Sequence, residues 1–237
     1  MIISQFSTAI EAGGVTLYLL ICCSILMLAV ILEKIVFFVA NHIDVDLFLS
    51  KIAKYLVKKE NDKAIDICKN EKKVLANMAL VILKRIGFSK EELEDAGDTA
   101  LEHGMLKYEF HISILGTLAV ISPFIGLMGT VFGIIQAFAD IAASSSAGQA
   151  IVAKGVSEAL IATAAGLIVA IPSSIFFNYF KNKAKALRIK YAIFLSKLIE
   201  TVVRISNDKE IASDIIQEDL EKEQDTKEKE DWHEIFK

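Results

Sequence analysis

The chain has 237 residues, of which 54% are hydrophobic and 24% are charged, and its formal net charge is −4. A soluble domain with this much charge is not expected to be so apolar. The two properties separate along the chain, because three stretches contain no Asp, Glu, Lys or Arg: residues 12–32, 111–139 and 159–180. This separation excludes a disordered chain, a disulfide-stapled secreted module and a single soluble core.

Each uncharged stretch has the roughly 20 residues that a helix needs to cross a membrane, and no fourth stretch does. We therefore expect an all-α membrane protein with three transmembrane helices, at residues 12–40, 111–140 and 154–181. The first helix is expected to be permanent rather than a cleaved signal. Its apolar run is longer than a signal core, and no Lys or Arg precedes it.

The distribution of Lys and Arg predicts the orientation of these helices. Residues 1–33 contain neither, residues 34–110 contain 13, and a further cluster follows the third apolar stretch. Because cytoplasmic flanks carry the excess of Lys and Arg, we expect the N-terminus outside and the C-terminus inside. The remaining segments are then an outer N-terminus, a cytoplasmic helical domain, a short periplasmic link and a charged cytoplasmic C-terminal helix or tail: residues 1–11, 41–110, 141–153 and 182–237.

The predicted cytoplasmic domain carries helical signals, and the transmembrane helices are expected to extend into it. Apolar residues recur at helical spacing after Asp44 and Asp46: Val45, Phe48, Leu49, Ile52 and Leu56. Ser89 is followed three residues later by Glu92, which is the spacing of a capping box, just after the helix breaker Gly87. We therefore predict that a helix begins near Ser89.

Cysteine and histidine do not form a recognisable site in the sequence. Cys22 and Cys23 are adjacent in the first apolar stretch and are expected to pack as apolar side chains. No spacing suits a metal site or a redox pair. The apolar stretches also lack paired catalytic acids, a nucleophile elbow and a phosphate loop, so we expect no cofactor, no metal, no nucleic-acid partner and no enzyme.

The second and third apolar stretches carry small residues at helical spacing, which allow helix backbones to approach closely in lipid. Both prolines of the chain also lie there, and each removes an amide donor, so a neighbouring helix has to satisfy the freed carbonyl group. We predict helix packing through these residues: Ser122, Pro123, Gly126, Gly129, Gly133, Ala159, Gly166 and Pro172.

Three polar residues of the second and third helices are candidates for a pore lining. Counted from the charged ends Asp140 and Lys154, Thr130 and Thr163 both lie about 14 Å inward at ~1.5 Å per residue, in one layer. Each hydroxyl could instead bond back to its own helix. Glu158 should face protein or water rather than lipid. It could pair with Lys154 one turn away, relay charge or line a pore mouth.

Two segments resemble the signatures of the MotA/TolQ/ExbB proton channel family, in its TolQ/ExbB branch. Residues 122–134 read SPFIGLMGTVFGI, with mild departures at Met128 and Phe132, and residues 155–167 read GVSEALIATAAGL. Ala170-Ile171-Pro172 and Asn178 also fit, and the match is best over about residues 110–181.

This resemblance implies a homo-oligomer, expected to be a pentamer, in the bacterial inner membrane. Its second and third helices would line a pore around the single-span helices of an ExbD- or TolR-like partner. Proton flow at that partner's aspartate would drive a TonB- or TolA-like protein, and the pore-lining roles fall on Thr130, Thr163 and Glu158. Because no ionisable residue lies in the middle of an uncharged stretch, we predict that a second polypeptide supplies the titrating carboxylate.

Several alternatives remain open at the level of sequence. Lys181, Lys183, Lys185 and Arg188 could only control topology, or could contact anionic lipid headgroups. The chain could be a non-conducting membrane scaffold for an envelope complex, or a flagellar-type stator subunit, although that branch normally has four transmembrane helices. The sequence separates neither a TolQ-like from an ExbB-like role nor H⁺ from Na⁺.

Overall fold

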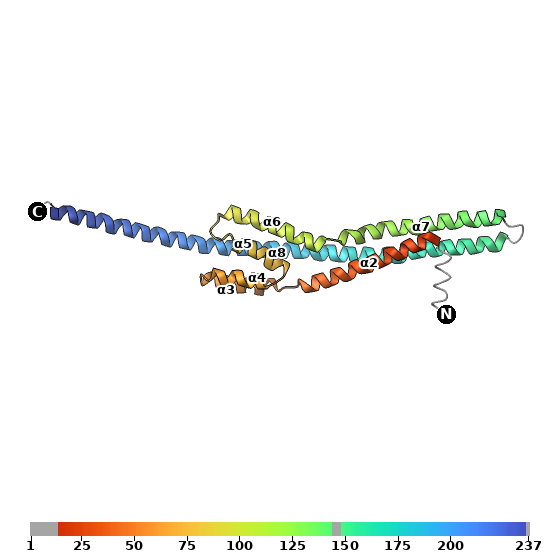
Figure 1. The fold of residues 1–237 in the computed structure, drawn as a ribbon, viewed down its shortest axis with the longest axis horizontal. Coiled ribbons are helices and arrows are strands. Elements are labelled where there is room, and N and C mark those ends of the chain that lie inside the picture. Colours follow the sequence, from red (N-terminus) through yellow and green to blue (C-terminus); the bar gives the residue numbers. More distant parts are fainter. Residues whose placement is uncertain (1–13, 144–147, 236–237) are drawn as a thin grey trace. The chain divides into compact units, whose positions relative to one another are not determined.

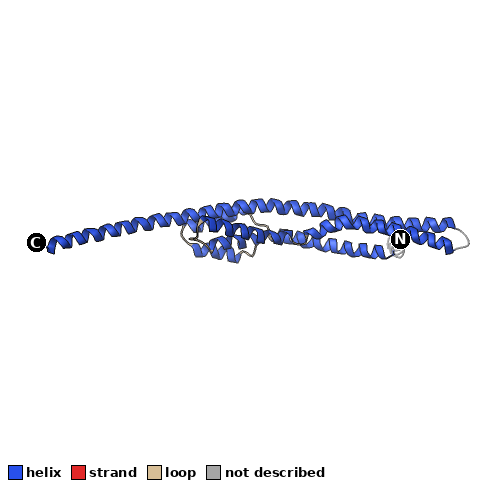
Figure 2. Ribbon diagram, turned by 90° about the horizontal axis from the view of Figure 1, so that it is seen from above, coloured by secondary structure: helices blue, strands red, loops and turns tan. Residues whose placement is uncertain are grey.

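The computed structural model describes residues 14–143 and 148–235, and every regular element within these ranges is an α-helix (Figures 1 and 2). The helices are α2 (Gly14–Ala40), α3 (Val45–Val57), α4 (Asn61–Asn70), α5 (Val74–Leu83), α6 (Lys90–Glu109), α7 (Ile112–Ala143) and α8 (Gly148–Ile235). Three helical regions are long and apolar enough to cross a membrane: Val15–Val57, Ile112–Ala142 and Val152–Asn207. The predicted all-α class with three candidate transmembrane helices is confirmed.

The chain divides into two compact units. The first unit combines Met1–Ala40 with Leu106–Leu187, and the second combines Asn41–Met105 with Arg188–Lys237. Each unit therefore contains its own part of the long helix α8. The candidate transmembrane helices provide most of the first unit, and the short helices α3 to α5 belong to the second.

In the first unit, α7 and the N-terminal part of α8 form an antiparallel hairpin, and α2 packs against α7 (Figure 1). Large apolar side chains point away from the unit on all three helices, for example Ile25, Phe124 and Ile168, which is 70% exposed. An apolar exterior of this kind is expected for helices that meet lipid or further helices.

The second unit buries an ordinary hydrophobic core between its helices. The rings of Phe48 in α3 and Phe194 in α8 stack with their centroids 5.9 Å apart. Ile52, Ile82 and Leu198 are fully buried. Apolar residues at helical spacing thus face one interior, as their sequence pattern predicts.

Side-chain caps define where two helices of the second unit begin. Asp44 accepts a hydrogen bond from the amide of Leu47 at 3.0 Å and caps α3. The predicted capping box of α6 is confirmed, since the Ser89 amide donates to Glu92 at 3.0 Å and the Glu92 amide donates to the Ser89 hydroxyl at 3.3 Å. Gly87 precedes it with φ +100°, a conformation that favours glycine.

Candidate functional site

The backbones of α7 and α8 touch at two glycines. A methyl group placed on Gly126 would lie 2.8 Å from the carbonyl oxygen of Ala162, and one on Gly166 would lie 2.6 Å from the carbonyl oxygen of Ser122. Both distances are shorter than any allowed contact, so neither position can hold a side chain without separating the helices. The structure therefore places Ser122, Gly126 and Gly166 in one backbone-to-backbone contact.

The same contact continues along the hairpin through other small residues. A methyl group on Gly133 would meet the side chain of Ala159 at 2.8 Å. A methyl group on Gly129 would meet the side chain of Ala162 at 2.6 Å and the hydroxyl of Thr16 at 2.9 Å. Gly129 thus lies where α7 contacts both α8 and α2.

Both prolines lie inside continuous helices, Pro123 in α7 and Pro172 in α8. Each stands beside a serine that is 0% exposed, Ser122 and Ser173. The Ser173 hydroxyl donates to the carbonyl oxygen of Val169 at 2.7 Å. A buried hydroxyl group therefore lies next to each proline, where a helix tends to bend.

The two candidate threonines use their hydroxyl groups differently. The Thr163 hydroxyl in α8 donates across the hairpin to the carbonyl oxygen of Gly126 in α7 at 3.2 Å. The Thr130 hydroxyl donates within α7 to the carbonyl oxygen of Leu127 at 2.6 Å. Since Thr130 follows Gly126 by about one helical turn, both hydroxyls belong to the same part of the hairpin.

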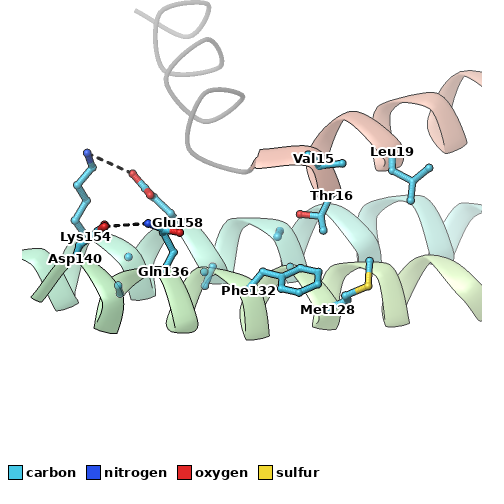
Figure 3. A pocket seen from close by; sticks show the side chains of 15 residues that line it. Val15, Thr16, Leu19, Met128, Phe132, Gln136, Asp140, Lys154 and Glu158 are labelled. Atoms are coloured by element: carbon cyan, nitrogen blue, oxygen red, sulfur yellow. Dashed lines mark hydrogen bonds and ion pairs between the residues drawn. The ribbon is translucent and has the colours of Figure 1, made fainter. Parts of the chain in front are cut away.

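Glu158 lines a cavity of about 630 Å³ between α2, α7 and α8 (Figure 3). Its carboxylate lies 3.8 Å from the ammonium group of Lys154, which is 79% exposed, so this ion pair is weak. On α7, the side-chain amide of Gln136 donates to Asp140 at 2.9 Å. Thr16 of α2 also lines the cavity. The structure thus shows Glu158 both beside Lys154 and at a partly polar cavity.

The threonines and Glu158 are not brought into one cavity, since the lining set contains Glu158 and, among the described residues, neither Thr130 nor Thr163. The cavity also has polar lining residues that were not predicted from the sequence: Thr16, Gln136 and Asp140. For Gln136 and Asp140, the four-residue spacing could have predicted a shared polar position, because it places both side chains on one helix face.

A second polar cluster, also not predicted from the sequence, joins α2 to the end of α6 and to His111 just before α7. The ammonium group of Lys34 donates to the carbonyl oxygens of Lys107 at 3.4 Å and Tyr108 at 3.2 Å, at the C-terminal end of α6. The ring of His111, whose φ is +64°, lies 2.7 Å from Glu33. Lys34 thus satisfies carbonyl groups that a helix end leaves free.

The basic residues proposed for lipid contact have protein neighbours of several kinds. In the first unit, Lys181 lies over the ring of Phe177 at 5.3 Å and Lys183 over the ring of Phe38 at 5.2 Å. Lys185 is exposed. In the second unit, Arg188 forms an ion pair with Glu102. The ammonium groups of Lys181 and Lys183 therefore already contact aromatic faces.

No group of three or more His, Cys, Asp or Glu that could hold a metal occurs within the ranges that the structure describes. Cys68 in α4 is 1% exposed, and burial raises the pKa of its thiol to about 12. A thiol with so high a pKa is almost entirely protonated at neutral pH and is a poor nucleophile.

Comparison with known proteins identifies a protein family whose sequence model covers this hairpin. The model of the MotA/TolQ/ExbB proton channel family matches residues 69–193, which include the end of α4, all of α5 to α7 and the first part of α8. The match begins well before residue 110, so it also covers part of the second unit that the motifs alone did not connect to the family.

Individual relatives match shorter stretches of the chain. The biopolymer transport protein ExbB of Salmonella typhimurium is 50% identical over 69 residues, which are 29% of this chain and 28% of the relative. The Tol-Pal system protein TolQ of Haemophilus influenzae is 37% identical over 102 residues, 43% of this chain and 45% of the relative. TolQ of Pseudomonas aeruginosa is 43% identical over 88 residues, 37% of this chain and 38% of the relative. The chain thus spans less than half the length of these relatives.

Proposed function

The chain belongs to the MotA/TolQ/ExbB proton channel family, and we propose that it is an inner-membrane subunit of an ExbB–ExbD or TolQ–TolR type motor. Such a motor converts proton motive force into work on the outer membrane through a TonB- or TolA-like protein. The relatives named ExbB and TolQ support this branch without choosing between its two members. We also propose that the N-terminus lies on the outer side of this membrane, that the C-terminus lies on the cytoplasmic side, and that H⁺ is the transported ion.

The observation that carries the proposal is that the inner stretches of the α7–α8 hairpin carry hydroxyl groups and no charged side chain. Between residues 111 and 139 and between residues 159 and 180, the sequence has no Asp, Glu, Lys or Arg. Thr163 nevertheless donates a hydrogen bond across the hairpin to Gly126, and Thr130 lies one turn further along α7. Hydroxyl groups can pass a proton but store no charge, so the proposed path needs a carboxylate from elsewhere.

We propose that a partner chain supplies this carboxylate. An ExbD- or TolR-like helix with a membrane aspartate would lie in a pore made by several copies of this chain, with five copies as the proposed number. The exposed apolar side chains of α7, such as Phe124, Phe132 and Phe138, provide surface for contacts with other subunits and lipid. Proton uptake by liposomes that contain this chain alone, at the rate of the full complex, would contradict the proposal.

Glu158 is proposed as the pore-facing acid of this path. Its side chain is 29% exposed and lines the 630 Å³ cavity together with Gln136 and Asp140. A half-buried carboxylate in a partly polar cavity can exchange protons with water.

Four basic residues after the third apolar stretch are proposed to contact anionic lipid headgroups in addition to their protein neighbours: Lys181, Lys183, Lys185 and Arg188.

The function is tested by replacing both threonines in the complex that co-purifies with this chain. Thr130→Ala combined with Thr163→Ala is expected to lower proton uptake into energised proteoliposomes at least tenfold, because it removes both hydroxyls. Thr117→Ala is the matched control, since Thr117 is an exposed α7 threonine whose hydroxyl donates only to Ser113 in its own helix, at 3.1 Å. The control is expected to keep full uptake.

A non-conducting scaffold is the alternative that a specific observation favours. The Thr130 hydroxyl already has a partner in its own helix at 2.6 Å, and the glycine contacts explain much of the hairpin by packing alone. A scaffold would keep full function in the double threonine variant. If transport is confirmed, deletion of the chain separates the two motor types, since an ExbB-like role predicts iron starvation and a TolQ-like role predicts detergent sensitivity.

A further inference from the structure

Ser122 presents a buried hydroxyl group without a protein partner. The residue is 0% exposed, and its Oγ is the one buried side-chain polar atom that lacks a hydrogen bond in the part of the chain that the structure describes. A buried hydroxyl that gives up water without gaining a partner costs free energy, so such groups are rare and call for an explanation.

A second unsatisfied group is expected directly beside it. Pro123 has no amide hydrogen, so the carbonyl group of Ala119, four residues earlier, loses its usual helical donor. Ser122 follows Ala119 by three residues, which puts its side chain next to that carbonyl on the helix surface. A carbonyl group that lacks its helical amide donor is thus expected three residues before Ser122.

The packing of α8 leaves little room beside Ser122. The backbone of α8 covers Ser122 at Gly166, where even a methyl group would lie 2.6 Å from the Ser122 carbonyl oxygen. Gly166 also has no side chain with which to bond the hydroxyl. The ligand has to be small and able both to donate and to accept hydrogen bonds, which describes a water molecule.

Ser173 provides a comparison within the same hairpin. Ser173 is also 0% exposed and adjoins Pro172, but its hydroxyl donates to Val169 at 2.7 Å. Among the residues that the structure describes, the hairpin therefore contains one buried serine hydroxyl with a protein partner and one without.

We propose that a single bound water molecule lies between α7 and α8 at Ser122, where it bridges the Ser122 hydroxyl and the carbonyl oxygen of Ala119. The site lies about one turn along α7 from Gly126, the acceptor for Thr163. This water satisfies the groups that Pro123 exposes and stabilises α7 at its proline. The site does not depend on the proposed transport function.

Water-edited solid-state NMR on the full-length chain in phospholipid bilayers tests the site directly, with Ser173 as the internal control. Magnetisation transfer from water to Ser122 Cβ and to the Ala119 carbonyl carbon is expected to build up several-fold faster than transfer to Ser173 Cβ. Equal and slow build-up at both serines would overturn the proposal, because Ser122 would then be as dry as Ser173.

The Ser122→Ala variant supplies an independent test, because its melting temperature should change in opposite directions depending on whether a water is bound at Ser122. If a water is bound, removing the hydroxyl takes away one of its partners, and the melting temperature should fall together with the water transfer to Ala119. If the hydroxyl is truly unpartnered, its removal relieves a cost and the melting temperature should rise, which contradicts the proposal. Unchanged transfer to Ala119 in this variant would also contradict it.

Discussion

The ammonium group of Lys34 lies 3.2 Å from the carbonyl oxygen of Tyr108, although the two residues are 74 positions apart in the sequence. Lys34 is only 1% exposed, and its charge meets Glu33 at 3.9 Å and the ring of Phe37 at 5.2 Å. A buried cation is tolerated where it has such partners. Lys34 therefore fastens α2 to the C-terminal end of α6.

Replacing Lys34 by Met should destabilise the protein by about 1.5–3 kcal/mol, the usual range for hydrogen bonds to a charged group. The variant removes the donor and keeps most of the apolar stem, while the carbonyl groups of Lys107 and Tyr108 lose a partner. Thermal unfolding of the purified chain in lipid nanodiscs measures the effect. Lys107→Met is the control, because that side chain is exposed, and an equal loss in both variants would contradict the prediction.

The threonines should differ in their contribution to stability. Thr163→Val removes a hydrogen bond between two helices and is expected to cost about 1 kcal/mol, whereas Thr130→Val removes one within a helix and should cost less. The same thermal measurement compares the two variants, which change the same atoms. A larger loss for Thr130→Val would show that the cross-hairpin bond is not the stronger constraint.

The sequence predicts much of this architecture because the relevant signals are local. Uncharged length predicts the three apolar helices, and the spacing of Ser89 and Glu92 predicts the start of α6. The partners of Lys34 and Thr163 are backbone carbonyl groups far away in the chain. Every residue has such a group, so the sequence does not show which of them accepts a hydrogen bond. The sequence therefore shows where a polar group lies along a helix, but only the packed structure shows what it bonds.

Glu158→Gln and Lys154→Met separate the two interpretations of the Glu158 carboxylate. If Glu158 only pairs with Lys154, both variants break the same weak contact and should change proton uptake equally little. If the carboxylate exchanges protons in the cavity, only Glu158→Gln should lower uptake, by roughly 100-fold or more, in line with loss of an acid–base group. Stability should change by less than about 1 kcal/mol in both variants. Equal uptake by the two would reject the acid role.

Gly166→Ala should disrupt the hairpin, because the added methyl group would lie 2.6 Å from a backbone oxygen that cannot move without its helix. We expect a loss of roughly 1–3 kcal/mol, the usual cost of overpacking. Gly97→Ala is the matched control, since its methyl group would meet the tip of the Ile199 side chain at 3.1 Å, and a side-chain tip can rotate away. Thermal unfolding in nanodiscs compares the two, and similar stability would argue against a rigid α7–α8 contact.

Cys68 should be protected from alkylation in the folded protein. Burial raises the pKa of its thiol from 9.0 to about 12, so at pH 8 the thiolate fraction falls from about one in ten to about one in ten thousand. In a Cys22→Ala/Cys23→Ala background, iodoacetamide should therefore label Cys68 at least 100-fold more slowly when folded than when denatured. Rapid labelling of the folded chain would show that α4 opens readily.

The raised pKa of Cys68 also predicts how stability depends on pH. The folded state holds the thiol proton more tightly than the unfolded state, so stability is fully present below about pH 9 and declines as pH rises towards 12. Other groups titrate in this range as well, and the difference between the unsubstituted chain and Cys68→Ala isolates the thiol. The melting temperature should fall more steeply between pH 8.5 and 10.5 in the unsubstituted chain, whereas parallel curves would mean that Cys68 titrates alike in both states.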